Sequence, residues 1–222
     1  MKKVCGLKYF HHPYSFPRSS PPSWAEKVDR WHQLDAYSFG LIDAYAHLQD
    51  RLEAPEFILL ASPSASNDAD QAFVLSKAKS PAKMVHTLPN VRSSSLVKFM
   101  GWGGPVLCLQ KDPQTLLTAI VEGLDLIDPS CRNLMIWGVV NQALFHGIPE
   151  LDGPPLYETH VFSLTYLASE ERSNKGFPYI IQRGGDDPSL TCPNDGLLVE
   201  WLSKPFSRGD LTISPQITLS PN

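Results

Sequence analysis

Short apolar runs alternate along this chain with longer stretches in which apolar residues recur every three or four positions. The short runs predict buried strands, and the longer stretches predict helices with one apolar face. The predicted strands cover residues 4–9, 57–61, 106–110, 133–140, 161–168 and 177–182. The predicted helices cover residues 35–52, 67–77, 93–100 and 113–127. Strands that alternate with helices indicate an α/β fold with a layered sheet and right-handed crossovers.

The junction between the strand 106–110 and the helix 113–127 is the most informative local feature. Asp112 is predicted at the N-cap and Pro113 at the first helical position. A carboxylate accepts hydrogen bonds from the first amides of a helix, and proline has no amide hydrogen to leave unsatisfied. The positive end of the helix dipole lowers the pKa of a thiol placed there. This turn therefore suits a reactive cysteine, yet it contains none.

Two motifs upstream of this turn carry a family resemblance. The first is Thr87-Leu88-Pro89-Asn90, and the second is Phe99-Met100-Gly101-Trp102-Gly103-Gly104-Pro105. Together they resemble the beta-ketoacyl synthase signature, in which a Thr-x-x-Asn turn and a helix lead to a Gly-Pro pair. The resemblance implies the N-terminal half of a thiolase-like fold, layered α-β-α, with a mostly parallel mixed sheet.

The resemblance also locates a degenerate nucleophile position. The family's catalytic cysteine follows the Gly-Pro pair at a fixed spacing, and the same count from Gly104 reaches Pro113, with Asp112 and Gln114 beside it. None of these side chains attacks a thioester, so no catalytic residue is expected in this half. The family's two catalytic histidines belong to a second half, for which 222 residues leave no room.

Because it lacks the nucleophile, this chain is similar to the chain-length-factor subunits of ketosynthases. Because it has about half the usual length, it is also similar to small subunits of aryl polyene type pathways. The resemblance therefore implies a non-catalytic subunit. Such a subunit pairs with an active ketosynthase and shapes its tunnel for polyketide or fatty-acid-like chains carried by acyl carrier protein. Two alternatives stay open. One is a stand-alone acyl-thioester enzyme that uses Cys108, Cys131 or Cys192 with a histidine, and the other is an acyl-binding scaffold dimer.

The strand before the degenerate turn is expected to be the dimer interface. It is implied to be the sheet edge where two subunits pair, and an unpartnered apolar edge recruits another strand. A heterodimer across this strand is expected, with a homodimer as the open alternative. The interface strand consists of Val106, Leu107, Cys108, Leu109 and Gln110.

The resemblance also assigns a tunnel wall to residues upstream of the interface strand. Small residues at 64–66 would leave a roomy channel, and Phe73 or Met84 would stop it; that these two side chains simply fill a core has at least equal weight. The assigned tunnel residues are Ser64, Ala65, Ser66, Phe73, Met84, Thr87 and Leu88.

Composition agrees with one globular domain over residues 1–222. Its core is expected at about 33–185, after a proline-rich segment at 10–24 and before a C-terminal extension at 186–222. The net charge of −4 argues against nucleic-acid or membrane-surface partners. The longest apolar run, 134–140, is far shorter than the ~20 residues that span a bilayer. A cytoplasmic protein is expected.

No metal and no cofactor are expected from the sequence. The four cysteines form no CxxC pair, and His11, His12, His32 and His47 have no carboxylate or cysteine partner at a useful spacing. Arg92 and Lys111 are candidates for contact with an acidic carrier protein, although isolated basic residues usually only solvate a surface.

Overall fold

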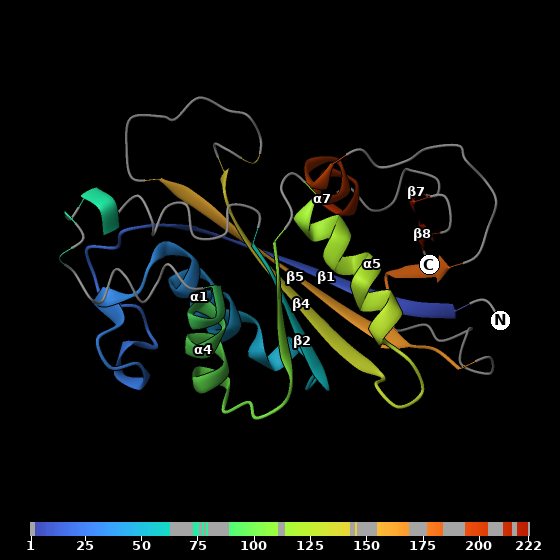
Figure 1. Ribbon diagram of the computed structural model, residues 1–222, viewed down its shortest axis with the longest axis horizontal. Coiled ribbons are helices and arrows are strands. Elements are labelled where there is room, and N and C mark those ends of the chain that lie inside the picture. The colour runs from blue at the N-terminus through green and yellow to red at the C-terminus, as the bar shows by residue number, and fades with distance from the viewer. Residues whose placement is uncertain are drawn as a thin grey trace.

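A mixed sheet of eight strands forms the centre of the molecule, with helices on both faces (Figure 1). The computed structural model describes residues 3–62, 73–75, 77, 79, 89–110, 114–142, 145, 155–168, 177–183, 194–203, 211–214 and 217–221. The strands are β1 (Lys3–Ser15), β2 (Phe57–Ala61), β3 (Val106–Leu109), β4 (Asn133–Asn141), β5 (Leu156–Tyr166), β6 (Tyr179–Arg183), β7 (Leu211–Ser214) and β8 (Ile217–Pro221). The helices are α1 (Ala36–Leu48), α4 (Pro89–Met100), α5 (Thr115–Leu126) and α7 (Asp195–Ser203), with short 3-10 turns η1 (Ala25–Lys27), η2 (Trp31–Gln33) and η3 (Gln49–Arg51).

The strand order is β3-β2-β4-β5-β1-β6-β8-β7. Strand β2 runs parallel to β3 and β4, whereas every other neighbouring pair is antiparallel. The expected mixed sheet is present. It is mostly antiparallel, however, and not mostly parallel as expected, because parallel pairing is confined to the edge formed by β3, β2 and β4. Parallel neighbours need a crossover connection, and α4 and α5 supply the crossovers between β2 and β3 and between β3 and β4.

The two faces of the sheet bury separate cores. Helices α1 and α4 cover one face, and α5 and α7 cover the other (Figure 1). Because side chains alternate along a strand, Val161 of β5 packs toward α1 while Phe162 packs toward α5 and α7. Helix α5 lies so close to β4 that a Cβ atom on Gly138 would clash with Leu116. No helix in the described part of the chain has the length and apolar character needed to cross a bilayer.

Several predicted elements match the structure closely. Strand β2 has the predicted bounds, and α1 begins after Asp35, whose carboxylate accepts a hydrogen bond from the Ser38 amide at 2.7 Å. Helix α4 starts four residues earlier than the predicted residue 93 and ends at Met100 as predicted. Gly101 follows in the left-handed conformation (φ 66°), which is a common way to end a helix. Of the helix predicted over 67–77, only residues 73–75 are both described and helical.

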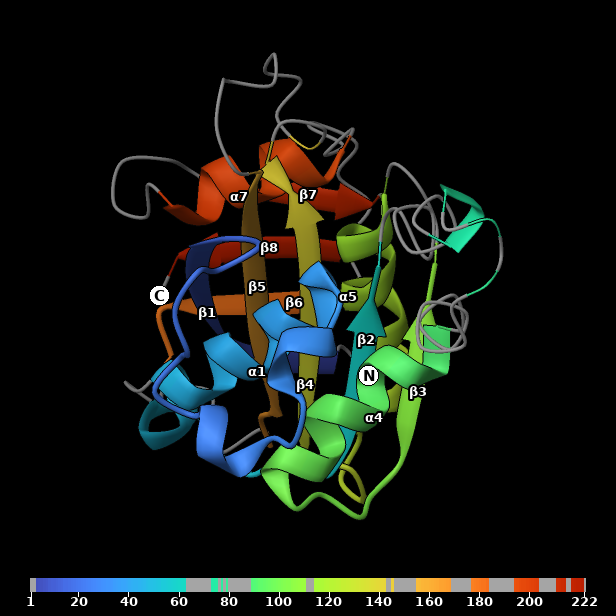
Figure 2. The same cartoon turned by 90° about the vertical axis from the view of Figure 1, so that its left-hand side faces the viewer.

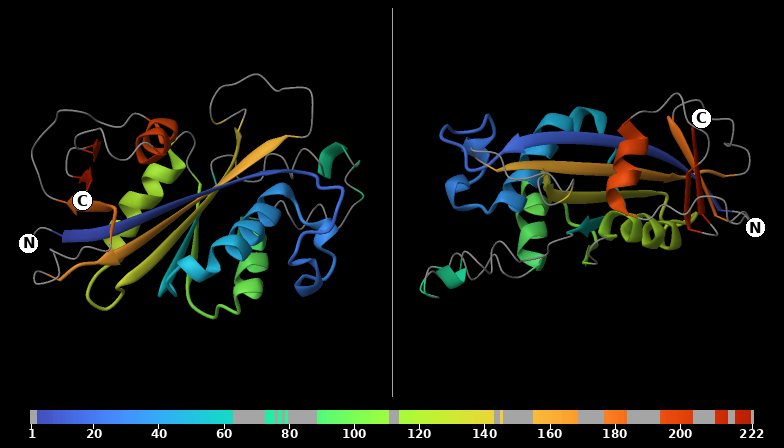
Figure 3. Two further views of the ribbon diagram at one scale, coloured as in Figure 1. Left: turned by 180° about the vertical axis from the view of Figure 1, so that it is seen from behind. Right: turned by 90° about the horizontal axis from the view of Figure 1, so that it is seen from above.

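The two chain ends contribute more to the sheet than the sequence predicts. Strand β1 extends to Ser15, so it includes the first residues of the proline-rich segment. It crosses the molecule from the C-terminal strands toward the α1 layer (Figure 3). In the C-terminal extension, α7 packs on the α5 face and β8 pairs with β6. Both ends therefore belong to the same sheet and core as the middle of the chain.

Candidate functional site

Strand β3 lies at one edge of the sheet, as predicted, and β7 lies at the opposite edge (Figure 2). Within the described residues, β2 is its sole neighbouring strand. Leu107 is 41% exposed, Val106, Cys108 and Leu109 are half-buried, and Gln110 is exposed. The C-terminal strands lie across the sheet from this edge, so they do not cover it. The predicted interface strand is thus an edge with an exposed apolar side chain.

The turn from β3 to α5 differs from its prediction. Asp112 and Pro113 lie outside the described residues, and α5 begins at Thr115 with Gln114 at the N-cap. The carboxylate at this helix end belongs to Asp195, the first residue of α7. It accepts hydrogen bonds from the amides of Leu116 and Leu117, both at 2.8 Å, and Asp195 is 1% exposed. The positive helix end favours an anion, and a residue far along the chain provides it.

The thiols of Cys108 and Cys131 are not activated. Burial raises the pKa of the Cys108 thiol, and this effect outweighs the lowering influence of Ser93 and Arg92. Burial, together with Glu56 and Asp128, also raises the pKa of Cys131. A raised pKa keeps a thiol protonated and weakly nucleophilic. Cys192 lies outside the described residues.

Arg92 is not available to a carrier protein, contrary to the sequence-based expectation. It is 1% exposed and donates hydrogen bonds to Asp35 Oδ2 at 3.2 Å and to Ser62 Oγ at 3.0 Å. Its guanidinium also lies 4.3 Å from the ring centroid of Tyr37. The arginine therefore joins α4 to the start of α1 and the end of β2. Lys111 lies outside the described residues.

Of the assigned tunnel residues, the structure describes Phe73. Phe73 is half-buried at the start of the helical turn 73–75. The other assigned tunnel residues lie outside the described residues: Ser64, Ala65, Ser66, Met84, Thr87 and Leu88.

The structure also contains two histidine–carboxylate clusters that were not predicted from the sequence, one on each face of the sheet. On the α1 face, His12 Nε2 donates to Asp43 Oδ2 at 2.9 Å and Trp24 Nε1 donates to Asp43 Oδ1 at 2.8 Å. Arg18 lies 3.6 Å from Asp43 Oδ2, and His47 Nδ1 donates to the Asp43 backbone oxygen at 2.7 Å. We call these residues the Asp43 cluster. Burial raises the pKa of Asp43, but its polar partners outweigh burial and lower it overall.

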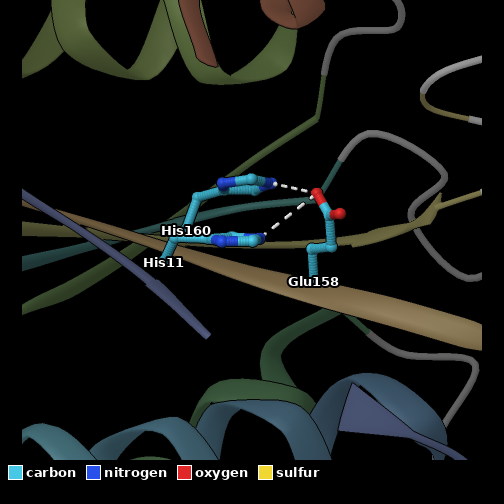
Figure 4. A group of neighbouring side chains, drawn as sticks. All are labelled: His11, Glu158 and His160. Carbon is cyan, nitrogen blue, oxygen red and sulfur yellow. Dashed lines mark ion pairs between the residues drawn. The ribbon is translucent and has the colours of Figure 1, made fainter. Parts of the chain in front are cut away.

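On the α5 and α7 face, Glu158 faces two stacked histidine rings (Figure 4). Its Oε2 atom is 3.5 Å from His11 Nε2 and 3.4 Å from His160 Nε2. Glu158 is 4% exposed and His160 is fully buried. Burial alone would raise the pKa of Glu158, but the two histidines hold it well below its usual range. We call these three residues the Glu158 cluster.

The pairing of β1 with β5 explains the Glu158 cluster. His11 lies directly opposite His160, and Glu158 is two residues before His160 on the same strand. Residues two apart on a strand share a face, so all three side chains point toward α7. A Glu-x-His pattern was visible in the sequence. It was missed because the predicted strand began at 161, whereas β5 begins at Leu156.

A cavity of about 550 Å³ opens beside the Glu158 cluster. His11 and Glu158 line its sheet side, and Phe145 contributes an aromatic wall. The α7 segment closes it with Asn194, Gly196, Val199, Glu200 and Ser203. The His11 side chain is 37% exposed, so the cluster borders solvent.

Comparisons with known proteins identify the fold. No protein-family model matches the sequence. A search of curated proteins finds no similar sequence. The chain is similar to a solved ketosynthase in complex with its chain length factor from Xenorhabdus doucetiae, with a TM-score of 0.57 and 16% identity. That match covers 92% of this chain and 84% of the other.

A second solved structure, the ishigamide ketosynthase/chain length factor, matches with a TM-score of 0.50 and 11% identity. This match covers 72% of the present chain, which spans about half (52%) of that chain. The chain has a ketosynthase-like fold. The α/β half-fold that the motifs at 87–105 implied is thereby confirmed. In this ketosynthase-like fold, β3 and α5 are the strand and helix between which the motifs predicted a degenerate nucleophile turn.

Proposed function

We propose that this chain is a non-catalytic, chain-length-factor-like subunit that pairs with an active beta-ketoacyl synthase through β3. It shapes the partner's acyl tunnel during elongation of polyketide or fatty-acid-like chains, of aryl polyene type, on acyl carrier protein. The observation that carries the proposal is an exposed edge strand that leads into a helix N-terminus without a thiol in its sequence. Both similar structures include a chain length factor, which supports this assignment.

The apolar surface near β3 supports docking of a partner. An unprotected edge strand exposes backbone donors and acceptors that pair with a strand of another chain. Leu107 adds apolar contact area on the edge itself. An exposed apolar side chain on an unpaired edge favours an interface.

The chemistry near β3 also favours a non-catalytic role. Sequence counting places proline where the family has its cysteine. The raised pKa of Cys108 and of Cys131 argues against either thiol as a nucleophile in a stand-alone enzyme. Asp195 already places a carboxylate on the first amides of α5, where a thiolate would otherwise gain stabilisation. An acyl thioester therefore has no described attacking group at this turn.

Coexpression with the ketosynthase whose gene lies nearest to the gene of this chain tests the pairing. We expect one-to-one copurification, and Leu107→Asp should abolish it because a buried charge at the edge is costly. Leu156→Asp is the matched control, since Leu156 is also exposed, at 48%, but starts β5. Equal copurification of both variants would overturn docking through β3. A homodimer in place of the mixed complex would favour the scaffold alternative.

Phe73 offers a separate test of the tunnel. If it lines the channel, Phe73→Ala should lengthen the products of the complex and Phe73→Trp should shorten them, because chain growth stops where volume runs out. Mass spectrometry of the released acyl chains measures this. Identical products from both variants would exclude Phe73 from the tunnel while leaving the pairing intact.

A further inference from the structure

We propose that the Glu158 cluster is a binding site for a divalent transition metal, with zinc as the best fit. His11 Nε2, His160 Nε2 and Glu158 Oε2 would be its protein ligands. The fourth coordination position would face the cavity under α7. This inference concerns a different part of the molecule from β3 and does not depend on the proposed pairing.

The donor set suits such an ion. Two imidazole nitrogens and one carboxylate oxygen are typical of zinc sites that keep an open position. All three donor atoms lie within 4.8 Å of one another. Figure 4 shows both imidazole rings directed toward the same Glu158 oxygen. Side chains from two adjacent strands therefore meet here, with the two imidazole rings stacked 5.3 Å apart between centroids and both facing Glu158.

The distances agree with a tetrahedral ion. With metal–ligand bonds of about 2.0–2.1 Å, neighbouring ligand atoms of a tetrahedron are about 3.4 Å apart. The two carboxylate–imidazole separations are 3.4 and 3.5 Å, longer than the ~2.9 Å of a good N–H···O hydrogen bond.

Outer partners hold two of the ligands in place. The Tyr9 hydroxyl lies 2.9 Å from His160 Nδ1, and Gln142 Nε2 donates to Glu158 Oε1 at 3.0 Å. Each contact occupies the remote atom of a ligand and leaves Nε2 or Oε2 directed at the site. Metal-binding histidines and carboxylates usually have such partners. With a metal on Nε2, the proton of His160 resides on Nδ1 and is donated to the Tyr9 oxygen.

The electrostatic surroundings attract a cation. Glu200 of α7 lines the same cavity as Glu158, and the described lining residues include no lysine or arginine. A second acidic residue therefore lines the cavity beside the site. Because His160 is fully buried and Glu158 nearly so, the local field is only weakly screened by solvent.

The Asp43 cluster has the same residue types but is already filled. Both Asp43 oxygens accept hydrogen bonds, and the Arg18 guanidinium lies 3.6 Å from one of them. A positive guanidinium at that distance repels a metal ion. His47 uses Nδ1 for the Asp43 backbone oxygen. This cluster therefore provides an internal control for the metal site.

Isothermal titration of zinc chloride into the full chain tests the proposal. We expect one equivalent to bind, with at least tenfold weaker affinity for His11→Ala and about tenfold for Tyr9→Phe. His12→Ala, which alters the opposite cluster, should bind as the wild type does. Cobalt substitution should give the strong visible absorption of a tetrahedral ion.

Three results would overturn the site. They are no saturable zinc binding by the wild-type chain, unchanged affinity in His11→Ala, or loss of binding in His12→Ala. Circular dichroism spectra of each variant establish whether it folds. If His11→Ala fails to fold, the absorption spectrum of the cobalt-loaded Glu158→Gln variant decides instead, since loss of the carboxylate ligand should shift its bands.

Discussion

Each face of the sheet buries a histidine–carboxylate cluster, but the two clusters differ in how fully their hydrogen bonds are satisfied. The Asp43 cluster is closed, because every carboxylate oxygen has a donor and Asp43 itself is fully buried. It ties β1 and the segment containing Arg18 and Trp24 to α1. The Glu158 cluster borders a cavity, and its histidine–carboxylate contacts of 3.4 and 3.5 Å are longer than the 2.9 Å contact between His12 and Asp43. From this difference we infer that a buried histidine–carboxylate pair stabilises the fold when its hydrogen bonds are saturated, and that a ligand can bind where space remains beside it.

Loss of the Asp43 carboxylate is the largest effect that this comparison predicts. Asp43→Ala should lower the free energy of unfolding by about 3 kcal/mol, because it leaves Trp24 and His12 without their acceptors and Arg18 without its counter-ion. Urea denaturation followed by circular dichroism measures it. Asp50→Ala is the control, because Asp50 is an exposed carboxylate in η3, directly after α1. A loss as small as that of the control would mean the cluster contributes little.

Replacement of Glu158 should cost less. For Glu158→Gln without metal we expect about 1 kcal/mol, because the amide retains the shape and solvent reaches His11. Urea denaturation of the metal-free proteins provides the comparison with Asp43→Ala. Should Glu158→Gln prove the more destabilising of the two, the roles assigned to the clusters would be reversed.

The dependence of stability on pH is the smallest predicted effect. The folded-state pKa of Asp43 lies below its unfolded value of about 4, so the unfolded chain binds the proton more tightly. Its contribution is therefore complete above about pH 4 and is lost as the pH falls toward the lower folded pKa. Hydrogen bonds from His12 and Trp24, together with the charge of Arg18, maintain this lowered pKa. Urea midpoints from pH 6 to 3 should fall less for Asp43→Asn than for the wild-type chain, and parallel curves would contradict the assignment.

Local patterns predicted much of the fold. The apolar run at 57–61 and the Asp35 cap are signals contained within a few residues, and both match the structure. The edge position of β3 also agreed, although it came from the family resemblance rather than from the strand itself.

Features that depend on distant pairing could not be predicted in this way. The register that sets His11 opposite His160 and the carboxylate that Asp195 gives to α5 join residues far apart in sequence. The cap at Asp112 was a sound local expectation, but helix α5 starts later and takes its anion from α7. Likewise, the residues next to Arg92 in the sequence do not indicate that it is buried. Its burial results from tertiary contacts with Asp35 and Tyr37.

The place of β1 within the sheet has a consequence for biosynthesis. Strand β1 is synthesised well before its neighbours β5 and β6, and β6 pairs in turn with β8, which is synthesised later still. The nascent polypeptide must keep β1 unpaired until β5 and β6 have been made, which slows folding and invites aggregation. Chaperone engagement during synthesis should therefore determine how much of this protein accumulates in a cell.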